Sequence, residues 1–301
     1  MSLFNKLVVA TLPVIPKSVV KLVAQRYIAG DKLSDAVRIT QNLMSKGACA
    51  TIDVLGEFVT TRDRAVSETA AQSAVIDAID QHKLHAYLSV KPTSLGLDVD
   101  QDFAFENLTS LVSKAKSKGI FVRMDMENTP YTDITLDFYR RLRANGFDNV
   151  GVVIQAYLRR SEQDIRSLLE YAPSVRLCKG IYVEGADVAF KDPDEIRSSY
   201  KSLLGMLLTS DASTHIATHD EQLIVDAERQ VAQHRAEKNN VEFQMLLGVR
   251  EDRRDALLRS GHKVRIYVPF GEDWYGYSTR RLKENPQVAG YVAKAMFTGR
   301  S

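Results

Sequence analysis

Eight short apolar runs recur along the chain and restrict the folds that it can adopt. Each run is nearly continuous in Val, Ile, Leu or aromatic residues, which is typical of a strand buried on both faces of a parallel sheet. The runs are ATIDVLGE (50–57), HAYLSVKP (85–92), GIFVRMDME (119–127), NVGVVIQAY (149–157), SVRLCKGIY (174–182), HIATHD (215–220), VEFQMLLGV (241–249) and KVRIYVPFG (263–271).

Helix signals stand between these runs. Asp192 followed by Pro193 predicts an N-cap with proline at the first helical position. Ser161 with Asp164 three residues later predicts a start that resembles a capping box. A third helical segment, TLDFYRRLRANG, stops at Gly146, which predicts a left-handed residue at its C-terminal end. The chain therefore alternates strands with helices.

The number of strands favours a closed barrel over an open doubly wound sheet. An open sheet of that kind normally carries a glycine-rich nucleotide-binding turn after its first strand, and the segment VLGEFVTTRD has only Gly56. A barrel of eight strand and helix units takes ~250 residues. We therefore expect an α/β fold in which residues 46–301 form a (β/α)8 TIM-type barrel and residues 1–45 form an N-terminal helical arm.

Charge and cysteine content argue against several classes of protein. The chain has 40 Lys and Arg against 38 Asp and Glu, so its formal charge of +2 provides no general attraction for nucleic acid. Cys49 and Cys178 each lie in an apolar run, which indicates a reducing, cytoplasmic compartment rather than a disulfide framework. No apolar stretch approaches the ~20 residues that span a bilayer. We expect any membrane contact to be peripheral, at the inner face.

Polar residues stand near the ends of most of the apolar runs. In a barrel of this kind the chemistry takes place at the C-terminal ends of the strands. Charged groups are costly to bury unless they are paired, so this many on strands that otherwise look like core predict one shared polar pocket. The residues are Lys91, Asp125, Glu127, Gln155, Arg176, Lys179, Tyr182, Thr218, His219, Asp220, Gln244 and Tyr267.

The stretch YGYSTRRLKENP follows the last apolar run and carries two adjacent arginines. Tyr277 lies three and four residues before Arg280 and Arg281. Glu284 lies four and three residues after them, so a helix would bring all four side chains together. Two neighbouring guanidinium groups match the geometry of a carboxylate or a phosphate. We therefore expect an anion site beside the barrel mouth.

The residues alone leave other functions open. A Schiff-base aldolase could use Lys91 or Lys179 as its nucleophile. A barrel that only binds a carboxylate ligand would also fit. His215 and His219 stand four residues apart without the glutamate of a zinc protease, so no metal site is expected.

The order of the motifs resembles the proline dehydrogenase family. SVKP, MDME, VVIQAY, VRLCKGIY, ATHD, EFQMLLG, IYVPFG and YSTRRLKEN follow one another across the second to eighth runs and the segment beyond them. The length resembles the compact bacterial monofunctional form. The resemblance implies a distorted barrel that holds FAD at its mouth. It also implies proline catabolism, in which L-proline is oxidised to Δ1-pyrroline-5-carboxylate by hydride transfer and a membrane quinone accepts the electrons.

The resemblance further implies roles for individual residues. Arg280 and Arg281 would hold the proline carboxylate, and Glu284, grouped with the cofactor contacts, would brace them. Asp125 would be a catalytic residue near the substrate, paired with Lys91, and a candidate for positioning or proton handling. Arg176 would lie against the isoalloxazine, where its charge assists hydride transfer. The remaining substrate contacts would be Lys91, Leu246, Tyr267 and Tyr277. The remaining flavin contacts would be Met126, Gln155, Lys179, Gly180, Ile181, Thr218 and His219.

Overall fold

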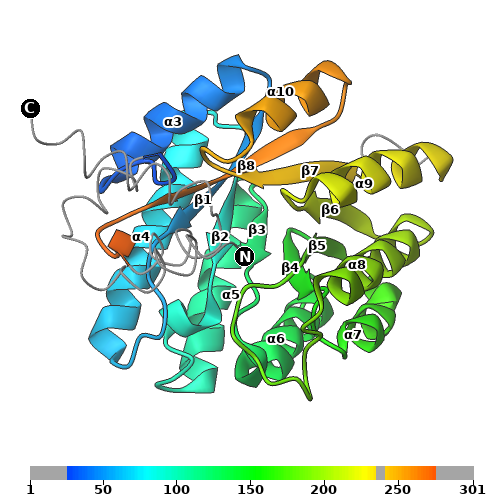
Figure 1. The fold of residues 1–301 in the computed structure, drawn as a ribbon. Coiled ribbons are helices and arrows are strands. Elements are labelled where there is room, and N and C mark those ends of the chain that lie inside the picture. The colour runs from blue at the N-terminus through cyan, green and yellow to red at the C-terminus, as the bar shows by residue number, and fades with distance from the viewer. Residues whose placement is uncertain (1–25, 235–240, 276–301) are drawn as a thin grey trace, which may run out of the picture.

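Eight parallel strands close into a barrel in the order in which they occur along the chain (Figure 1). The computed structural model describes residues 26–234 and 241–275. The barrel closes where β1 pairs with β8, with Thr51 opposite Tyr267. The strands are β1 (Cys49–Val54), β2 (Ala86–Val90), β3 (Val122–Met124), β4 (Val150–Gln155), β5 (Ser174–Cys178), β6 (Ser213–Ala217), β7 (Val241–Leu246) and β8 (Val264–Phe270).

Helices surround the barrel and cover the outer face of its strands (Figure 1). The apolar core therefore lies between the strands and the helices, as in Ile52 of β1 and Leu88 of β2, both fully buried. The helices are α3 (Leu33–Ser45), α4 (Arg62–Gln81), α5 (Gln101–Ser117), α6 (Thr132–Ala144), α7 (Ser161–Leu168), α8 (Pro193–Leu208), α9 (Glu221–Gln233) and α10 (Glu251–Arg259), with short 3-10 turns η2 (Pro92–Leu95), η3 (Thr129–Tyr131) and η4 (Leu169–Tyr171). The expected (β/α)8 TIM-type fold is confirmed.

The described part of the expected N-terminal arm contains α3. This helix packs against β1 and β8. The segment before it is tied to the end of β8, since Ala29 N donates to Pro269 O at 2.9 Å and Gly271 N donates to Gly30 O at 3.0 Å. Residues 1–25 lie outside the described part, so the arm and its boundary at residue 45 stay a prediction.

Two of the three expected helix ends are confirmed. The Asp192 side chain accepts a hydrogen bond from Asp194 N at 2.7 Å, and Pro193 is the first residue of α8. Gly146 follows α6 with φ of +79°. The expected cap at Ser161 is wrong, because α7 begins at that residue and its hydroxyl donates to Gln155 O at 2.6 Å.

Alternation along the strands places polar side chains inside the barrel. Successive side chains of a strand point to opposite faces, so residues two apart share a face. Arg123 and Asp125 are therefore neighbours on the inner side, as are Arg265 and Tyr267. The barrel interior is consequently polar at two levels, one at the base and one at the mouth.

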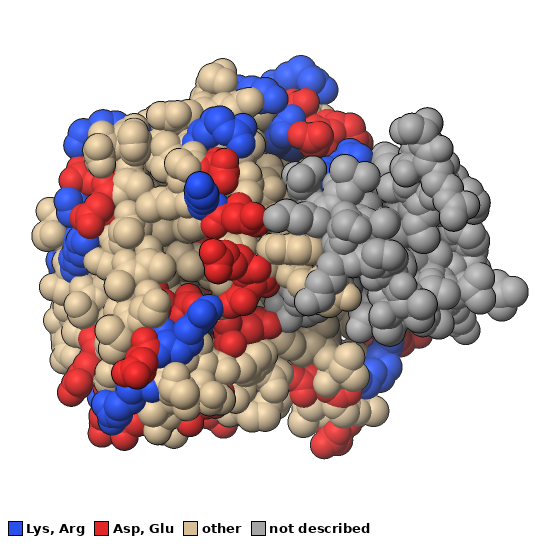
Figure 2. Space-filling model, turned by 90° about the vertical axis from the view of Figure 1, so that its left-hand side faces the viewer, with Lys and Arg blue, Asp and Glu red and all other residues tan. Residues whose placement is uncertain are grey.

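Charged side chains of both signs are scattered over one face of the molecule (Figure 2). Figure 2 shows basic and acidic groups interspersed over one face, with several acidic groups gathered near its middle. This distribution agrees with the nearly balanced count of charges in the whole sequence. In the described ranges, no helix combines the length and the apolar character that crossing a membrane requires.

Candidate active site

Asp125 joins two other side chains at the barrel mouth. It follows β3, and its backbone N–H donates to Val90 O at 2.8 Å. The hydrogen bonding between β2 and β3 therefore extends as far as Asp125. Its Oδ1 accepts from Arg176 Nη1 at 2.7 Å, and its Oδ2 accepts from Tyr267 Oη at 2.8 Å. The Arg176 guanidinium also lies 5.5 Å from the centre of the Tyr267 ring. Three strands therefore contribute to one fixed cluster.

Lys91 lies beside this cluster, and its nearest partner is a residue that we did not single out from the sequence. Its Nζ is 2.7 Å from Asp53 Oδ1, 3.5 Å from Tyr267 Oη and 4.0 Å from Asp125 Oδ2. The expected pairing of Lys91 with Asp125 is thus present only at 4.0 Å. The sequence does contain a sign of this role, because Asp53 is a charged residue inside the apolar run ATIDVLGE. A charged residue inside an apolar run is also what indicated Arg176.

The pKa values of this pair follow from their burial and their charges. Burial raises the pKa of the Asp53 carboxyl to about 6, with Lys91 opposing the shift and Asp125 adding to it. Burial alone would lower the pKa of Lys91, but the charges of Asp53 and Asp125 raise it above its ordinary value. Lys91 is therefore a charged ammonium at neutral pH.

Glu127 holds the turn that follows Lys91. Its carboxylate is fully buried and accepts from Thr93 N at 3.1 Å and from Thr93 Oγ1 at 2.5 Å. Burial raises the pKa of Glu127 to about 7, with the hydrogen bonds from Thr93 opposing the shift. Gln155 at the end of β4 donates to Glu127 O at 2.9 Å. Glu127 therefore links η2 to the ends of β3 and β4.

The residues after β5 to β7 line the mouth next to Arg176. Lys179 Nζ is 3.2 Å from Asp220 Oδ2 and remains 43% exposed. Thr218 is buried, and its hydroxyl accepts from Asp220 N at 3.2 Å. His219 Nε2 accepts from Leu246 N at 2.9 Å, so this nitrogen carries no proton. These contacts fix the three loops relative to one another.

Three other predicted contacts have distinct surroundings. Gly180 has φ of +111°, and a Cβ there would lie 2.1 Å from Tyr157 Cδ1. Ile181 and Leu246 are half-buried near the mouth. Met126 is buried within the hydrophobic core, which leaves its backbone as the group available for a cofactor contact.

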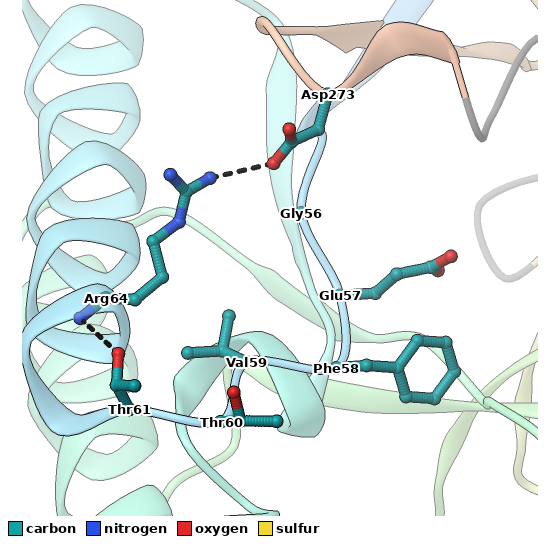
Figure 3. Close-up of a pocket in the computed structure, with 8 residues that line it drawn as sticks. All are labelled: Gly56, Glu57, Phe58, Val59, Thr60, Thr61, Arg64 and Asp273. Atoms are coloured by element: carbon teal, nitrogen blue, oxygen red, sulfur yellow. Dashed lines mark hydrogen bonds and ion pairs between the residues drawn. The ribbon is translucent and has the colours of Figure 1, made fainter.

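Most of the stretch YGYSTRRLKENP, from Gly276 onward, lies outside the described residues. Asp273, shortly before that stretch, is joined to α4 by an ion pair of 2.7 Å with Arg64 Nη2 (Figure 3). Both residues line a hollow of about 250 Å³, together with the segment 56–61 that follows β1. Figure 3 shows Glu57 and Phe58 of this segment pointing away from Arg64. The residues whose placement stays a prediction are Tyr277, Arg280, Arg281 and Glu284.

A second polar group fills the base of the barrel. Arg265 Nε donates to Glu242 Oε1 at 2.7 Å, and Arg123 Nη2 lies 2.8 Å from His215 Nδ1. Burial lowers the pKa of His215 well below its ordinary value, with Glu242 opposing the shift and Arg123 adding to it. Within the described ranges, no group of three or more His, Cys, Asp and Glu side chains could hold a metal ion.

Gln244 connects the base to the mouth. Its Oε1 accepts from Arg176 Nε at 2.5 Å, and its Nε2 donates to Glu242 Oε1 at 2.5 Å. A continuous hydrogen-bonded path therefore runs from Asp125 through Arg176 and Gln244 to Glu242. This path orients the Arg176 guanidinium from both sides.

Comparisons with known proteins identify the family to which the chain is similar. A family model described as proline dehydrogenase matches residues 36–294. The chain is 39% identical over 276 residues to proline dehydrogenase 1 of Bacillus subtilis, covering 92% of this chain and 91% of the relative. It is 36% identical over 280 residues to proline dehydrogenase of Deinococcus radiodurans, covering 92% of this chain and 90% of the relative.

A solved structure shares the fold. A chain of proline utilization A from Bdellovibrio bacteriovorus, inactivated by N-propargylglycine, is similar with a TM-score of 0.82 at 23% sequence identity. The match covers 93% of this chain and 34% of that chain. At this identity the likeness establishes the barrel architecture.

Proposed function

The chain belongs to the proline dehydrogenase family, and from that premise we propose that it oxidises L-proline to Δ1-pyrroline-5-carboxylate with FAD as the hydride acceptor. A membrane quinone would then take the electrons. The observation that supports this chemistry is the cluster of Asp125, Arg176 and Tyr267 beside Lys91 at the C-terminal ends of the strands, where barrel enzymes carry out their reactions.

The residues at the mouth fit a flavin. FAD, when bound, supplies an acceptor for hydride. The side chain of Arg176 is 9% exposed. Its guanidinium donates to Asp125 on one side and to Gln244 on the other. A cation fixed in this way stabilises the negative charge that hydride acceptance creates, without having to reorganise. The other residues that would hold the cofactor are Met126, Gln155, Lys179, Gly180, Ile181, Thr218, His219 and Glu284.

Cationic groups would orient the substrate. Arg280 and Arg281 would bind the proline carboxylate, because a pair of guanidinium groups can form parallel hydrogen bonds with its two oxygens. Lys91 would add a charge, since its raised pKa keeps it protonated. Fixing the carboxylate sets the position of the carbon that loses hydride. Leu246, Tyr267 and Tyr277 would form the walls of the pocket.

The charged state of Lys91 argues against the aldolase alternative. A Schiff base needs a neutral amine, and the Asp53 carboxylate 2.7 Å away favours the ammonium. Lys179 is also paired, with Asp220 at 3.2 Å. Borohydride trapping of a substrate adduct on either lysine would favour the aldolase instead.

We also propose that the protein works in the cytoplasm and meets the inner face of the membrane peripherally. Two features support this: neither Cys49 nor Cys178 forms a disulfide within the described residues, and the proposed electron acceptor is dissolved in the bilayer.

Steady-state turnover tests the proposal. The purified protein is mixed with L-proline and a short-chain quinone, and both quinone reduction and imine formation are followed. We expect L-proline to give equal amounts of reduced quinone and imine, and cyclopentanecarboxylate, which has no amine, to give neither. Quinone reduction that does not depend on proline would refute the proposed reaction.

A further inference from the structure

Asp53 is a buried charge at the mouth that has no role in the proposed reaction so far. It is 1% exposed and lies near the C-terminal end of β1. Its register partner on β2 is Ser89, which stands two residues before Lys91 and so points to the same face. This alternation directs the carboxylate of Asp53 and the chain of Lys91 toward one another inside the barrel.

We propose that Asp53 is a positioning residue for the substrate site, whose carboxylate holds the Lys91 ammonium at the barrel mouth. The inference rests on the proposed function, because it assigns Lys91 to the proline carboxylate. Asp53 would act through Lys91 and would not itself touch the substrate.

The distances around Lys91 support this assignment. Its Nζ makes a close ion pair only with Asp53 among its described partners, at 2.7 Å against 4.0 Å for Asp125. Both oxygens of Asp125 already accept, from Arg176 and from Tyr267. Without Asp53, the ammonium would depend on Asp125, which lies 4.0 Å away and already binds Arg176.

Asp53 also separates the charges at the mouth into two pairs. Asp53 neutralises Lys91, and Asp125 neutralises Arg176. Each cation then keeps its own anion, so Arg176 can face the cofactor while Lys91 faces the substrate. A buried pair is strongly destabilised when one partner is removed, since an uncompensated charge remains. The Asp53 carboxylate therefore determines whether Lys91 can stay in place as an ammonium.

The protonation state of Asp53 should be visible in the pH dependence of the reaction. The charged or titratable groups that face it are Lys91 directly after β2, Asp125 directly after β3 and Tyr267 of β8. Burial raises its pKa to about 6, with Lys91 opposing and Asp125 adding. The carboxylate is thus charged above this pH and neutral below it. Its hold on Lys91 is lost as the pH falls through about 6.

The test compares three variants of the flavin-loaded enzyme. Asp53→Asn keeps the shape but removes the charge, and Asp53→Glu keeps the charge. Ser89→Ala is the matched control, because Ser89 is a fully buried register partner whose hydroxyl has no hydrogen bond within the described residues. We measure kcat and KM for L-proline from pH 5 to pH 9, flavin content, and binding of cyclopentanecarboxylate by calorimetry.

We expect Asp53→Asn to raise KM for L-proline about 10-fold to 100-fold at pH 8, because the substitution weakens a hydrogen bond to a charged group. The acidic limb of kcat/KM near pH 6 should disappear, and binding of cyclopentanecarboxylate should weaken by a similar factor. Flavin content should match that of the wild type. Asp53→Glu should recover part of the lost affinity, and Ser89→Ala should keep the wild-type profile.

Two results would overturn the inference while leaving the proposed function intact. In the first, the wild type oxidises proline, and Asp53→Asn has the same KM for L-proline and the same acidic limb of kcat/KM as the wild type. The other is an equal loss of flavin in Asp53→Asn and Asp53→Glu, which would make Asp53 a structural residue. A wild type that does not oxidise proline would instead refute the proposed function.

Discussion

At the scale of single residues, Asp125 organises the barrel mouth. Its two oxygens accept from Arg176 and from Tyr267, residues on strands β5 and β8. One carboxylate therefore holds a cation and a tyrosine hydroxyl in fixed positions. In the proposed reaction Asp125 would align Arg176, the cation that would face the flavin.

The arginine pair gives the first prediction at this scale. Arg280→Ala and Arg281→Ala should each raise KM for L-proline about 10-fold or more, because each removes a charge-assisted hydrogen bond to the carboxylate. Flavin absorbance should remain. Lys283→Ala is the control, since it removes a cation from the same stretch outside the arginine pair. Steady-state kinetics decide the matter, and unchanged KM in both arginine variants would contradict the carboxylate clamp.

Glu127 gives a second prediction, on stability. Its pKa is raised from 4.5 to about 7 in the folded protein, so the folded state binds this proton more tightly than the unfolded chain. Its contribution to the free energy of unfolding is therefore full below about pH 4.5 and is lost as the pH rises through about 7. The expected change is on the order of 1–3 kcal/mol.

Glu127→Gln isolates this effect. The amide can accept from Thr93 N and donate to the Thr93 hydroxyl, but it does not titrate. Urea unfolding at pH 5 and pH 8 gives the difference in free energy of unfolding between the wild type and the variant. We expect the wild type to lose stability relative to Glu127→Gln as the pH rises. A difference that stays the same at both pH values would contradict the assigned pKa.

Part of this site was predictable from the sequence, and the reason is physical. Arg176 and Asp125 stand out because a charge in an apolar strand needs a partner, and the structure brings the two within 2.7 Å. Asp53 carries the same signal and was missed. Which carboxylate pairs with Lys91 depends on the register of β1 against β2, and residue spacing does not reveal that.

At the scale of elements, the loop after β5 has a narrow steric tolerance. Gly180 has φ of +111°, and an added Cβ would meet the Tyr157 ring at 2.1 Å. Gly119 also has a positive φ, +67°, but nothing lies within 4 Å of its Cβ position. Both glycines therefore have a positive φ that disfavours other residues, but only at Gly180 would an added Cβ also collide with a neighbouring side chain.

This contrast gives a prediction for the loop. Gly119→Ala should cost about 1–2 kcal/mol of stability from the positive φ alone. Gly180→Ala should cost more, because Tyr157 or the loop must move, and it should lower the flavin content of the purified protein. Thermal unfolding and the ratio of flavin to protein absorbance measure both effects. Equal behaviour of the two variants would show that the loop accommodates the methyl group.

The strands were more predictable than the helix ends. Buried parallel strands leave continuous apolar runs, and each of the eight expected runs overlaps a strand of the barrel. Ser161 shows why helix ends are harder. Its hydroxyl donates to Gln155 O, a contact that depends on how the end of β4 approaches α7.

At the scale of the whole molecule, polar side chains fill the interior of the barrel, and an apolar core lies between its strands and the surrounding helices. The path from Asp125 through Arg176 and Gln244 to Glu242 runs between the mouth and the base. Closure of the barrel through the pairing of β1 with β8 brings Asp53, Lys91 and Tyr267 together from distant parts of the chain. The number of apolar runs predicted this closure, whereas the partners inside the barrel required the structure.

The most direct test of the proposed function is the visible absorbance spectrum of the purified protein before and after L-proline is added without oxygen. We predict the absorbance bands of an oxidised flavin, and we predict that L-proline bleaches them while cyclopentanecarboxylate does not. A protein without flavin bands, or one whose bands L-proline leaves unchanged, would contradict the proposal that this barrel oxidises proline with FAD.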